Sequence, residues 1–338
     1  MLGRYILPDI EMIGLKSLLE PIRRLINGNH IVANLESPLS RCHFPNGKGD
    51  ASLLSAPIEM ATQLRQAGVS AVSLGNNHIF DFGVKGLTDT ILALDTQDIK
   101  HTGAGMDLDS ATKPVFINVD GYKVGILAFS YTPQASKDKP GVAYIYDDTV
   151  NNTISKVRKN VDFLVVMPHA GIEFYQYPLI RDQNVYRKMI ELGADLIIGS
   201  HPHCIQAMEI YKDRFIFYSL GDSFFDHYHE AVWEERLVRS SVLPLYAMLD
   251  SPDPPEHSLS VKLNFVNGNP KIIYEPLKSH NKLGPNLMEG EERKRWFVQF
   301  EKLCMNLQNS QSVQEKRAEL QNMLFKTLKK RGLLLNNF

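Results

Sequence analysis

The sequence predicts a layered α/β fold, and two features of its hydrophobic pattern lead to this expectation. Short aliphatic runs of strand length alternate with stretches whose apolar residues recur at helical spacing. Several of the short runs end abruptly in residues that can bind a metal ion. Open α/β sheets place their ligand sites at the carboxyl ends of the strands, so this position of the polar residues is typical of the fold class.

The first expected elements alternate between strand and helix. Residues 30–33 are a short aliphatic run that predicts a buried strand, and residues 69–74 predict a second strand for the same reason. Residues 58–67 place their apolar side chains at helical spacing between these strands, and residues 86–94 do so after the second one.

A hairpin and a further buried strand follow. Residues 114–119 and 123–129 are predicted strands, and Asp120-Gly121 between them is a strong signal for a tight hairpin turn. Residues 162–167 form another aliphatic run and predict another buried strand. The alternation of element types therefore continues into the middle of the chain.

The last part of the chain adds strands and ends in helices. In order, we expect a helix at 183–192, strands at 194–198, 214–220, 259–266 and 271–276, and two helices from Glu291 to about Lys330. Asn267-Gly268-Asn269 predicts a hairpin between the last two strands. We therefore expect one domain over residues 1–289 and a C-terminal helical extension over residues 290–338.

Four of the strand ends carry the residues that point to a metal site. These residues are Glu36, Asn77 with His78, His169, and His201 with His203. If the backbone stays extended past residue 198, His201 and His203 project to the same side of the chain. Two loop histidines alone are more often ordinary surface residues. Four such strand ends in one chain predict a shared site of carboxylate, amide and imidazole groups.

Composition and charge exclude several classes of protein. The formal net charge of −1 gives no electrostatic reason to expect binding to nucleic acid or to an anionic membrane. The three cysteines are widely spaced, so they form neither a disulfide framework nor a CxxC metal site. The chain as written carries no membrane-spanning run and no signal segment. We expect it to be cytoplasmic, and membrane-associated or exported only if an upstream segment is missing.

Five ordered motifs resemble the bacterial capsule synthesis CapA family, which is associated with poly-γ-glutamate capsules. They are Asn34–Leu39, Gly75–His78 with Asp81–Gly83, Gly103–Gly105, His169–Glu173 and Gly199–His203. Tyr218–Gly221 is similar to a further segment of the family, although Asp222 stands where Asn is expected. The family in turn resembles the calcineurin-like metallophosphoesterases. The resemblance implies a metallophosphatase-like β-sandwich flanked by helices, and it extends from Met1 to about Glu289.

The resemblance also implies a role for each residue of the predicted site. Glu36 matches a carboxylate that bridges two metal ions, Asn77 matches an amide ligand, and His169, His201 and His203 match imidazole ligands. His78 matches the catalytic histidine that contacts the substrate oxyanion or the leaving group. Further candidates for substrate contacts are Asn34, Asn76, Asp81, Glu173 and Asp222.

The expected cofactor is a divalent metal, with one or two ions in the site. Oxygen and nitrogen ligands without a thiolate suit Mn²⁺, Fe or Zn²⁺. In the family, however, a strand ending in Gly-Asp precedes the segment that matches Met1–Arg4. The first strand and the first metal-binding Asp are therefore expected to be missing from the chain as written. A sheet that had lost a central strand would leave backbone groups unpaired, so a truncated start is favoured over a lost strand.

Two classes of function remain open. The first is a metal-dependent hydrolase that acts on a phosphoester, or on a γ-glutamyl or related bond of a capsule polymer. The second is a non-catalytic component of the capsule-synthesis machinery, which binds polymer or a partner enzyme in the same pocket. The retained His78 favours the first class, and the missing Asp favours the second. Fold alone does not separate them.

Overall fold

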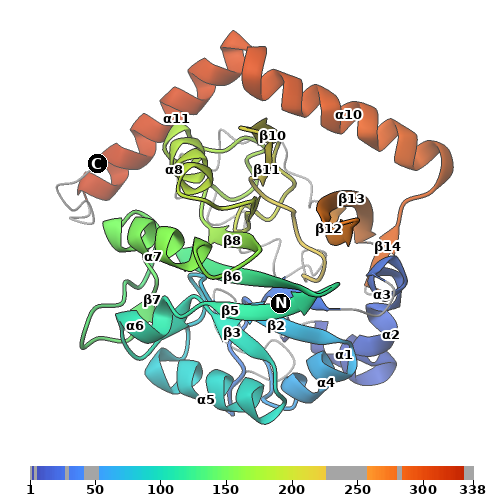
Figure 1. Ribbon diagram of the computed structural model, residues 1–338, viewed down its shortest axis with the longest axis vertical. Helices are drawn as coiled ribbons and strands as arrows, with labels where there is room; N and C mark the ends of the chain where they lie inside the picture. Colours follow the sequence, from blue (N-terminus) through green and yellow to red (C-terminus); the bar gives the residue numbers. More distant parts are fainter. Residues whose placement is uncertain are drawn as a thin grey trace.

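The protein has the expected layered α/β fold. A computed structural model describes residues 2–3, 6–26, 30–41, 53–225, 257–279 and 284–330. Two packed sheets form its centre, with helices on the outer face of each (Figure 1). The prediction of a β-sandwich flanked by helices is confirmed for the described part of the chain.

The first sheet is parallel, with strand order β1-β2-β3. Its strands are β1 (Ile31–Asn34), β2 (Val69–Ser73) and β3 (Lys100–Thr102). Helices α4 (Met60–Gln66) and α5 (Gly83–Thr96) lie between these strands in sequence, as parallel pairing requires. All three carboxyl ends consequently lie at the same edge of the sheet.

The second sheet has six strands in the order β10-β11-β9-β8-β6-β5. Its strands are β5 (Val115–Val119), β6 (Tyr122–Ser130), β8 (Phe163–His169), β9 (Leu196–Ile198), β10 (Met208–Tyr211) and β11 (Arg214–Phe217). The four central strands are parallel, and the two outer ones pair antiparallel. Asp120 and Gly121 both have positive φ, 53° and 89°, so the predicted hairpin between β5 and β6 is confirmed.

Smaller elements complete the fold. The second predicted hairpin is also confirmed, and it joins two strands of a three-stranded sheet, β12 (His257–Val266), β13 (Asn269–Ser279) and β14 (Pro285–Leu287). The pair β4 (Ala104–Gly105) and β7 (Gly141–Val142) forms a separate ladder. The other helices are α1 (Leu7–Ile13), α2 (Leu15–Leu18), α3 (Glu20–Ile26), α6 (Leu108–Ala111), α7 (Asp148–Arg158), α8 (Ile180–Glu191), α10 (Gly290–Asn309) and α11 (Gln311–Lys330).

Three hydrophobic cores separate the four layers. One core packs β2 against α4 and α5, a second lies between the two sheets, and a third packs β6 and β8 against α7 and α8. Strand β6 shows how the pattern works, because Ile126 faces the core between the sheets and Leu127 faces the helices. A strand buried on both faces reads as a continuous aliphatic run, which is why this one was visible in the sequence.

A cavity of about 360 Å³ lies against β1 and β12. Within the described residues, each of these two strands is paired on one side only. Apolar side chains of the six-stranded sheet line the cavity, and Glu36 and Asp222 also belong to its lining. The cavity therefore adjoins the polar residues that follow β1.

The C-terminal helices share hydrophobic cores with the rest of the protein. Trp296 and Phe300 of α10 are buried in the core between the sheets, beside Leu259 and Met288. The division of the chain at residue 289 stays a prediction. Among the helices that the structure describes, none has the length and hydropathy needed to cross a bilayer.

We expect Arg317→Met to lower the free energy of unfolding by about 2–4 kcal/mol. Arg317 of α11 is only 1% exposed and donates hydrogen bonds to Pro178 O (2.8 Å) and Gln183 Oε1 (2.6 Å), so its loss leaves buried acceptors without donors. Urea unfolding measures the change. Lys294→Met, which removes an exposed ion pair with Glu291, is the control and should cost under about 1 kcal/mol. Equal losses of unfolding free energy in the two variants would contradict a stabilising role for the buried Arg317 hydrogen bonds.

Candidate metal centre

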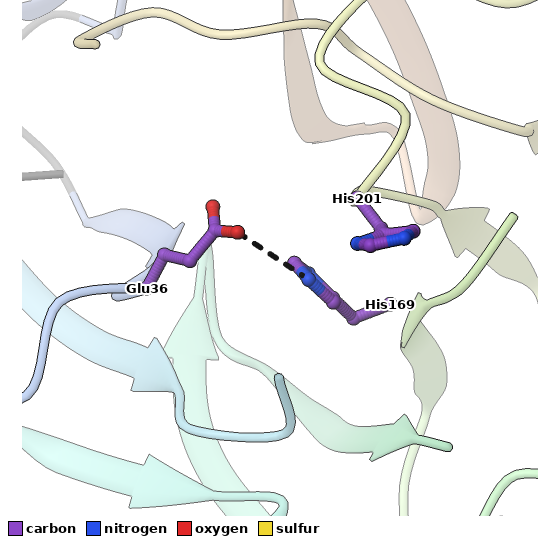
Figure 2. Close-up of side chains that lie close together, drawn as sticks. All are labelled: Glu36, His169 and His201. Atoms are coloured by element: carbon purple, nitrogen blue, oxygen red, sulfur yellow. Dashed lines mark ion pairs between the residues drawn. The ribbon is translucent and has the colours of Figure 1, made fainter. Parts of the chain in front are cut away.

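The residues predicted from four strand ends meet at one place. His169 is the last residue of β8, and parallel pairing aligns it with Ser130 of β6 on one side and Ser200 on the other. Glu36 follows β1 and points at the same position, with 3.5 Å between its Oε1 atom and His169 Nε2 (Figure 2). The His201 ring lies beside that of His169, with 5.0 Å between the ring centroids.

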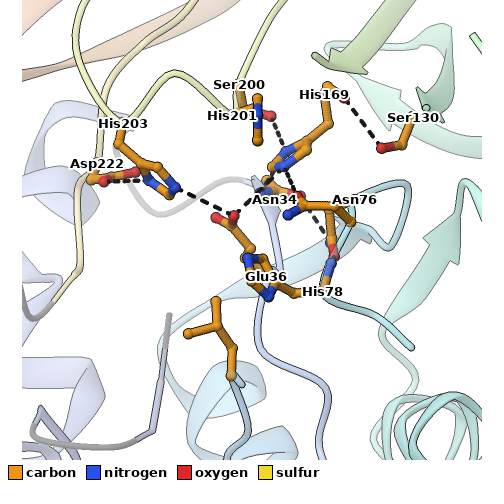
Figure 3. A network of polar contacts seen from close by, with 12 residues as sticks. Asn34, Glu36, Asn76, His78, Ser130, His169, Ser200, His201, His203 and Asp222 are labelled. Carbon is orange, nitrogen blue, oxygen red and sulfur yellow. Dashed lines mark hydrogen bonds and ion pairs between the residues drawn. The ribbon is translucent and has the colours of Figure 1, made fainter. Parts of the chain in front are cut away.

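Two groups of side chains could each hold a cation, and Glu36 belongs to both. The first group is Glu36, His169 and His201, and the second is Glu36, His203 and Asp222. Within each group, the ligand atoms lie within 4.8 Å of one another. Figure 3 shows both groups in one polar network at the ends of the strands. The arrangement suits two cations that share a carboxylate.

Two buried polar atoms indicate that this site fits a metal. Glu36 Oε1 and His201 Nδ1 are both buried, and neither has a hydrogen-bond partner among the described residues. Buried polar atoms are normally satisfied, so two unsatisfied atoms on residues of one cluster need an explanation. A divalent cation supplies one, and the oxygen and nitrogen ligands fit Mn²⁺, Fe or Zn²⁺.

His169 is held as a neutral imidazole by its surroundings. Burial lowers its pKa well below the ordinary value, and the neighbouring charges of His201 and His203 lower it further. Its Nδ1 atom lies 2.9 Å from Ser200 Oγ, and its Nε2 atom lies 2.8 Å from Asn77 Oδ1. Asn77 is therefore in contact with the site, as a ligand to the same ion would be.

The backbone at His201 and His203 is not extended, contrary to the expectation from the sequence. Both residues have positive φ, 99° and 54°, in a region that non-glycine residues rarely adopt. A turn therefore brings their rings together, with 6.1 Å between the centroids. Strain of this kind persists where the surrounding structure imposes it, and it is concentrated at functional sites.

His203 differs from the other two histidines in its charge. Burial opposes its protonation, but the carboxylates of Asp222 and Glu36 outweigh that effect and raise its pKa to about 9. Its Nδ1 atom lies 2.9 Å from Asp222 Oδ2, and its Nε2 atom lies 3.8 Å from Glu36 Oε1. The sequence placed Asp222 among the substrate contacts, whereas the structure gives it a direct contact with His203.

His78 lies near the site but in neither group of candidate ligands. Its Nδ1 atom is 2.8 Å from Asp81 Oδ2, which also accepts a hydrogen bond from the Leu54 backbone N–H at 2.6 Å. Asp81 therefore fixes the orientation of the His78 ring. Such a pair is typical of a histidine that exchanges a proton with substrate.

Three other predicted residues support or border the site. Asn76 is fully buried and donates to Leu35 O at 2.9 Å, and it also bonds to Asn34, so it braces the loops. Asn34 Nδ2 lies 3.4 Å from His169 Nδ1. Glu173 lies close enough for its charge to act on His201 and His203.

The sequence analysis did not identify Tyr131 as a site residue. Its hydroxyl lies 3.3 Å from His201 Nε2, and the two rings meet edge to face at a centroid distance of 5.3 Å. The feature of the sequence that could have revealed Tyr131 is its position directly after β6, next to Ser130 at the aligned strand ends.

Several known proteins are similar to this chain in sequence. The family model described as "Bacterial capsule synthesis protein PGA_cap" matches residues 1–227. The capsule biosynthesis protein CapA of Bacillus anthracis is 29% identical over 327 residues, which cover 93% of this chain and 77% of that protein. The PGA biosynthesis protein CapA of Bacillus subtilis (strain 168) is 31% identical over 232 residues, or 67% of this chain. The match spans 61% of the length of the B. subtilis protein.

A solved structure is also similar at low sequence identity. It is a hypothetical protein from Thermus thermophilus, with a TM-score of 0.49 and 15% sequence identity. The alignment covers 82% of this chain and 97% of that one.

The charge on His203 predicts a pH-dependent stability in protein stripped of metal with EDTA. The folded pKa of about 9 lies above the unfolded value of 6.5, so the contribution is complete below pH 6.5 and is lost as pH rises through 9. The free energy of unfolding of the wild type should exceed that of His203→Gln by on the order of 2–3 kcal/mol near pH 6.5, and this difference should shrink toward pH 10. Urea unfolding of both proteins at each pH measures this difference. A difference that stays constant or widens as the pH rises would refute the charge assigned to His203.

Substitutions at the two carboxylates should affect cation binding differently. Glu36→Gln removes the negative charge of the carboxylate common to both groups and replaces one of its oxygens with an amide nitrogen. The binding of both Zn²⁺ ions should therefore weaken by more than the ~10–100-fold typical of outer-shell changes. Asp222→Asn should weaken the binding of only one of the two ions, because Asp222 belongs to one group. Isothermal titration calorimetry on EDTA-treated protein measures both stoichiometry and affinity. Unchanged binding in Glu36→Gln would show that the cations lie elsewhere.

Proposed function

The chain belongs to the PGA_cap family of bacterial capsule synthesis proteins, and on that basis we propose that it is a metal-dependent hydrolase of capsule biosynthesis. The observation that carries the proposal is the position of Glu36 between two sets of candidate ligands, with one carboxylate oxygen buried and unsatisfied. A structural metal site closes its ligand shell. In this protein, by contrast, His78 belongs to neither set of candidate ligands and lies beside the site, where it could act on a substrate.

The proposed mechanism assigns the residues to holding metal or moving protons. Glu36, His169 and His201 would hold one cation, and Glu36, His203 and Asp222 a second. Held by these residues, divalent cations would supply Lewis-acid chemistry, lowering the pKa of water and countering negative charge on the scissile group. Asn77, whose Oδ1 atom lies 2.8 Å from His169 Nε2, would be a further ligand to the first cation.

His78 is assigned the proton transfer. Its Nδ1 atom is bonded to Asp81, which leaves Nε2 as the atom that exchanges a proton with substrate. We infer that His78 protonates the leaving group or stabilises the developing oxyanion. Asp81 positions the ring through this contact.

The substrate belongs to one of two classes. A phosphoester fits the chemistry of two cations that share a carboxylate. A γ-glutamyl bond of a capsule polymer fits the context given by the CapA relatives, whose names place them in capsule and PGA biosynthesis. The same names describe synthesis and not cleavage, which favours the alternative of a non-catalytic component that binds polymer or a partner enzyme in this pocket.

A comparison of His78→Ala with His201→Ala tests the proposal. His78→Ala should keep the metal content and lose ~10²–10⁴-fold in turnover. His201→Ala should lose metal and activity together, because it removes a candidate ligand. Metal is measured by elemental analysis, and turnover is measured with bis(p-nitrophenyl) phosphate and with poly-γ-glutamate.

His101→Ala is the matched control. His101 also pairs with an aspartate, at 3.2 Å from Asp95, but it belongs to neither group of candidate ligands, so its loss should change neither readout. Parallel loss of metal in His78→Ala would refute the division of roles. Wild-type protein that binds metal and polymer but cleaves neither substrate would support the non-catalytic alternative.

A further inference from the structure

We propose that Tyr131 is a positioning residue that sets which nitrogen of His201 binds the metal, an inference that rests on the proposed metal centre. The Tyr131 hydroxyl would accept the Nε2–H of His201 and so present the Nδ1 lone pair to the cation shared with Glu36. The ligand set would then be mixed, with His201 bound through Nδ1 and His169 and His203 through Nε2.

The first support is the geometry around His201. Its Nε2 atom lies 3.3 Å from the Tyr131 hydroxyl oxygen, whereas its Nδ1 atom is buried without a hydrogen-bond partner. A neutral imidazole carries one N–H and one lone pair. If Nε2 carries the proton, Tyr131 satisfies it, and the ring atom left unsatisfied is the Nδ1 lone pair of a residue grouped with Glu36 and His169.

The second support is the packing of the two rings. They meet edge to face at a centroid distance of 5.3 Å, which keeps the Tyr131 hydroxyl beside the His201 ring. The oxygen of a phenol can accept a hydrogen bond as well as donate one.

The third support is the contrast with the other two histidines. His169 and His203 have their Nδ1 atoms on Ser200 Oγ and Asp222 Oδ2, both at 2.9 Å, and their Nε2 atoms toward Glu36. His201 has the reverse arrangement, with the outer partner on Nε2. An outer partner on one ring nitrogen commonly fixes the tautomer of a metal-binding histidine.

Tyr131 is rigidly placed for this task. It follows Ser130, whose Oγ donates to His169 O at 3.2 Å, so the strand end that carries Tyr131 is tied to the strand end that carries a candidate ligand. The Tyr131 ring also packs against the core beneath α7 and α8. Tyr131→Phe should therefore keep the ring in place and remove only the hydroxyl.

The experiment compares Tyr131→Phe with Tyr146→Phe in the full chain, using Zn²⁺ as the probe. Tyr146 is the matched control because its hydroxyl donates to Asp182 at 2.7 Å, away from the candidate ligands. Calorimetry should show Zn²⁺ binding weakened by ~10–100-fold in Tyr131→Phe and unchanged in Tyr146→Phe. Thermal unfolding of the metal-free variants checks that both remain folded.

A second readout reports the tautomer directly and does not depend on any Tyr131 variant. Long-range ¹H–¹⁵N NMR of the Zn²⁺-loaded wild type, with His201 assigned from the spectrum of His201→Gln, should show zinc on Nδ1 and a proton on Nε2. If Tyr131 contacted substrate only, Tyr131→Phe would keep the full Zn²⁺ affinity of the wild type.

The outcomes separate this inference from the proposed function. Zinc on His201 Nε2, or full Zn²⁺ affinity in folded Tyr131→Phe, overturns the role of Tyr131 while the metal centre stands. Failure of the wild type to bind Zn²⁺ at all overturns both.

Discussion

The arrangement of the site depends on one buried carboxylate. Glu36 is only 4% exposed, and one of its oxygens has no hydrogen bond although it lies 3.5 Å from His169 and 3.8 Å from His203. A buried charge without compensation is unstable, so something must balance it. In the metal-free protein the protonated His203 does so in part. A cation held on either side of Glu36, as proposed, would compensate the charge further.

Parallel strand pairing brings the partners of Glu36 to it. The registers between β6, β8 and the segment after β9 align Ser130, His169 and Ser200 at one edge, and β1 delivers Glu36 from the facing sheet. Each candidate imidazole then has one nitrogen held by an outer group: Ser200 for His169, Tyr131 for His201, Asp222 for His203 and Asp81 for His78. Such outer contacts limit ring rotation, so the site is pre-organised before any ion binds.

The sequence revealed those parts of the protein whose cause is local. Strands such as β6 and β8 are aliphatic runs because both faces are buried, and the two hairpins follow from Asp-Gly and Asn-Gly turns. Helices α1 to α3 escaped prediction because each has at most two buried side chains, too few to show a helical period. The contacts of Asp222 and Tyr131 escaped because they join segments far apart in sequence. Convergence of His201 and His203 was expected from an extended backbone but arises from a turn at two residues with positive φ.

An anomalous difference map from crystals soaked in Mn²⁺ would locate the cations that Glu36 is proposed to share. We expect two peaks ~3.5–4 Å apart on either side of the Glu36 carboxylate. His169 and His201 should coordinate one peak, and His203 the other. Manganese bound away from Glu36, or a Glu36 carboxylate that stays without a bound ion at saturating Mn²⁺, would contradict this expectation.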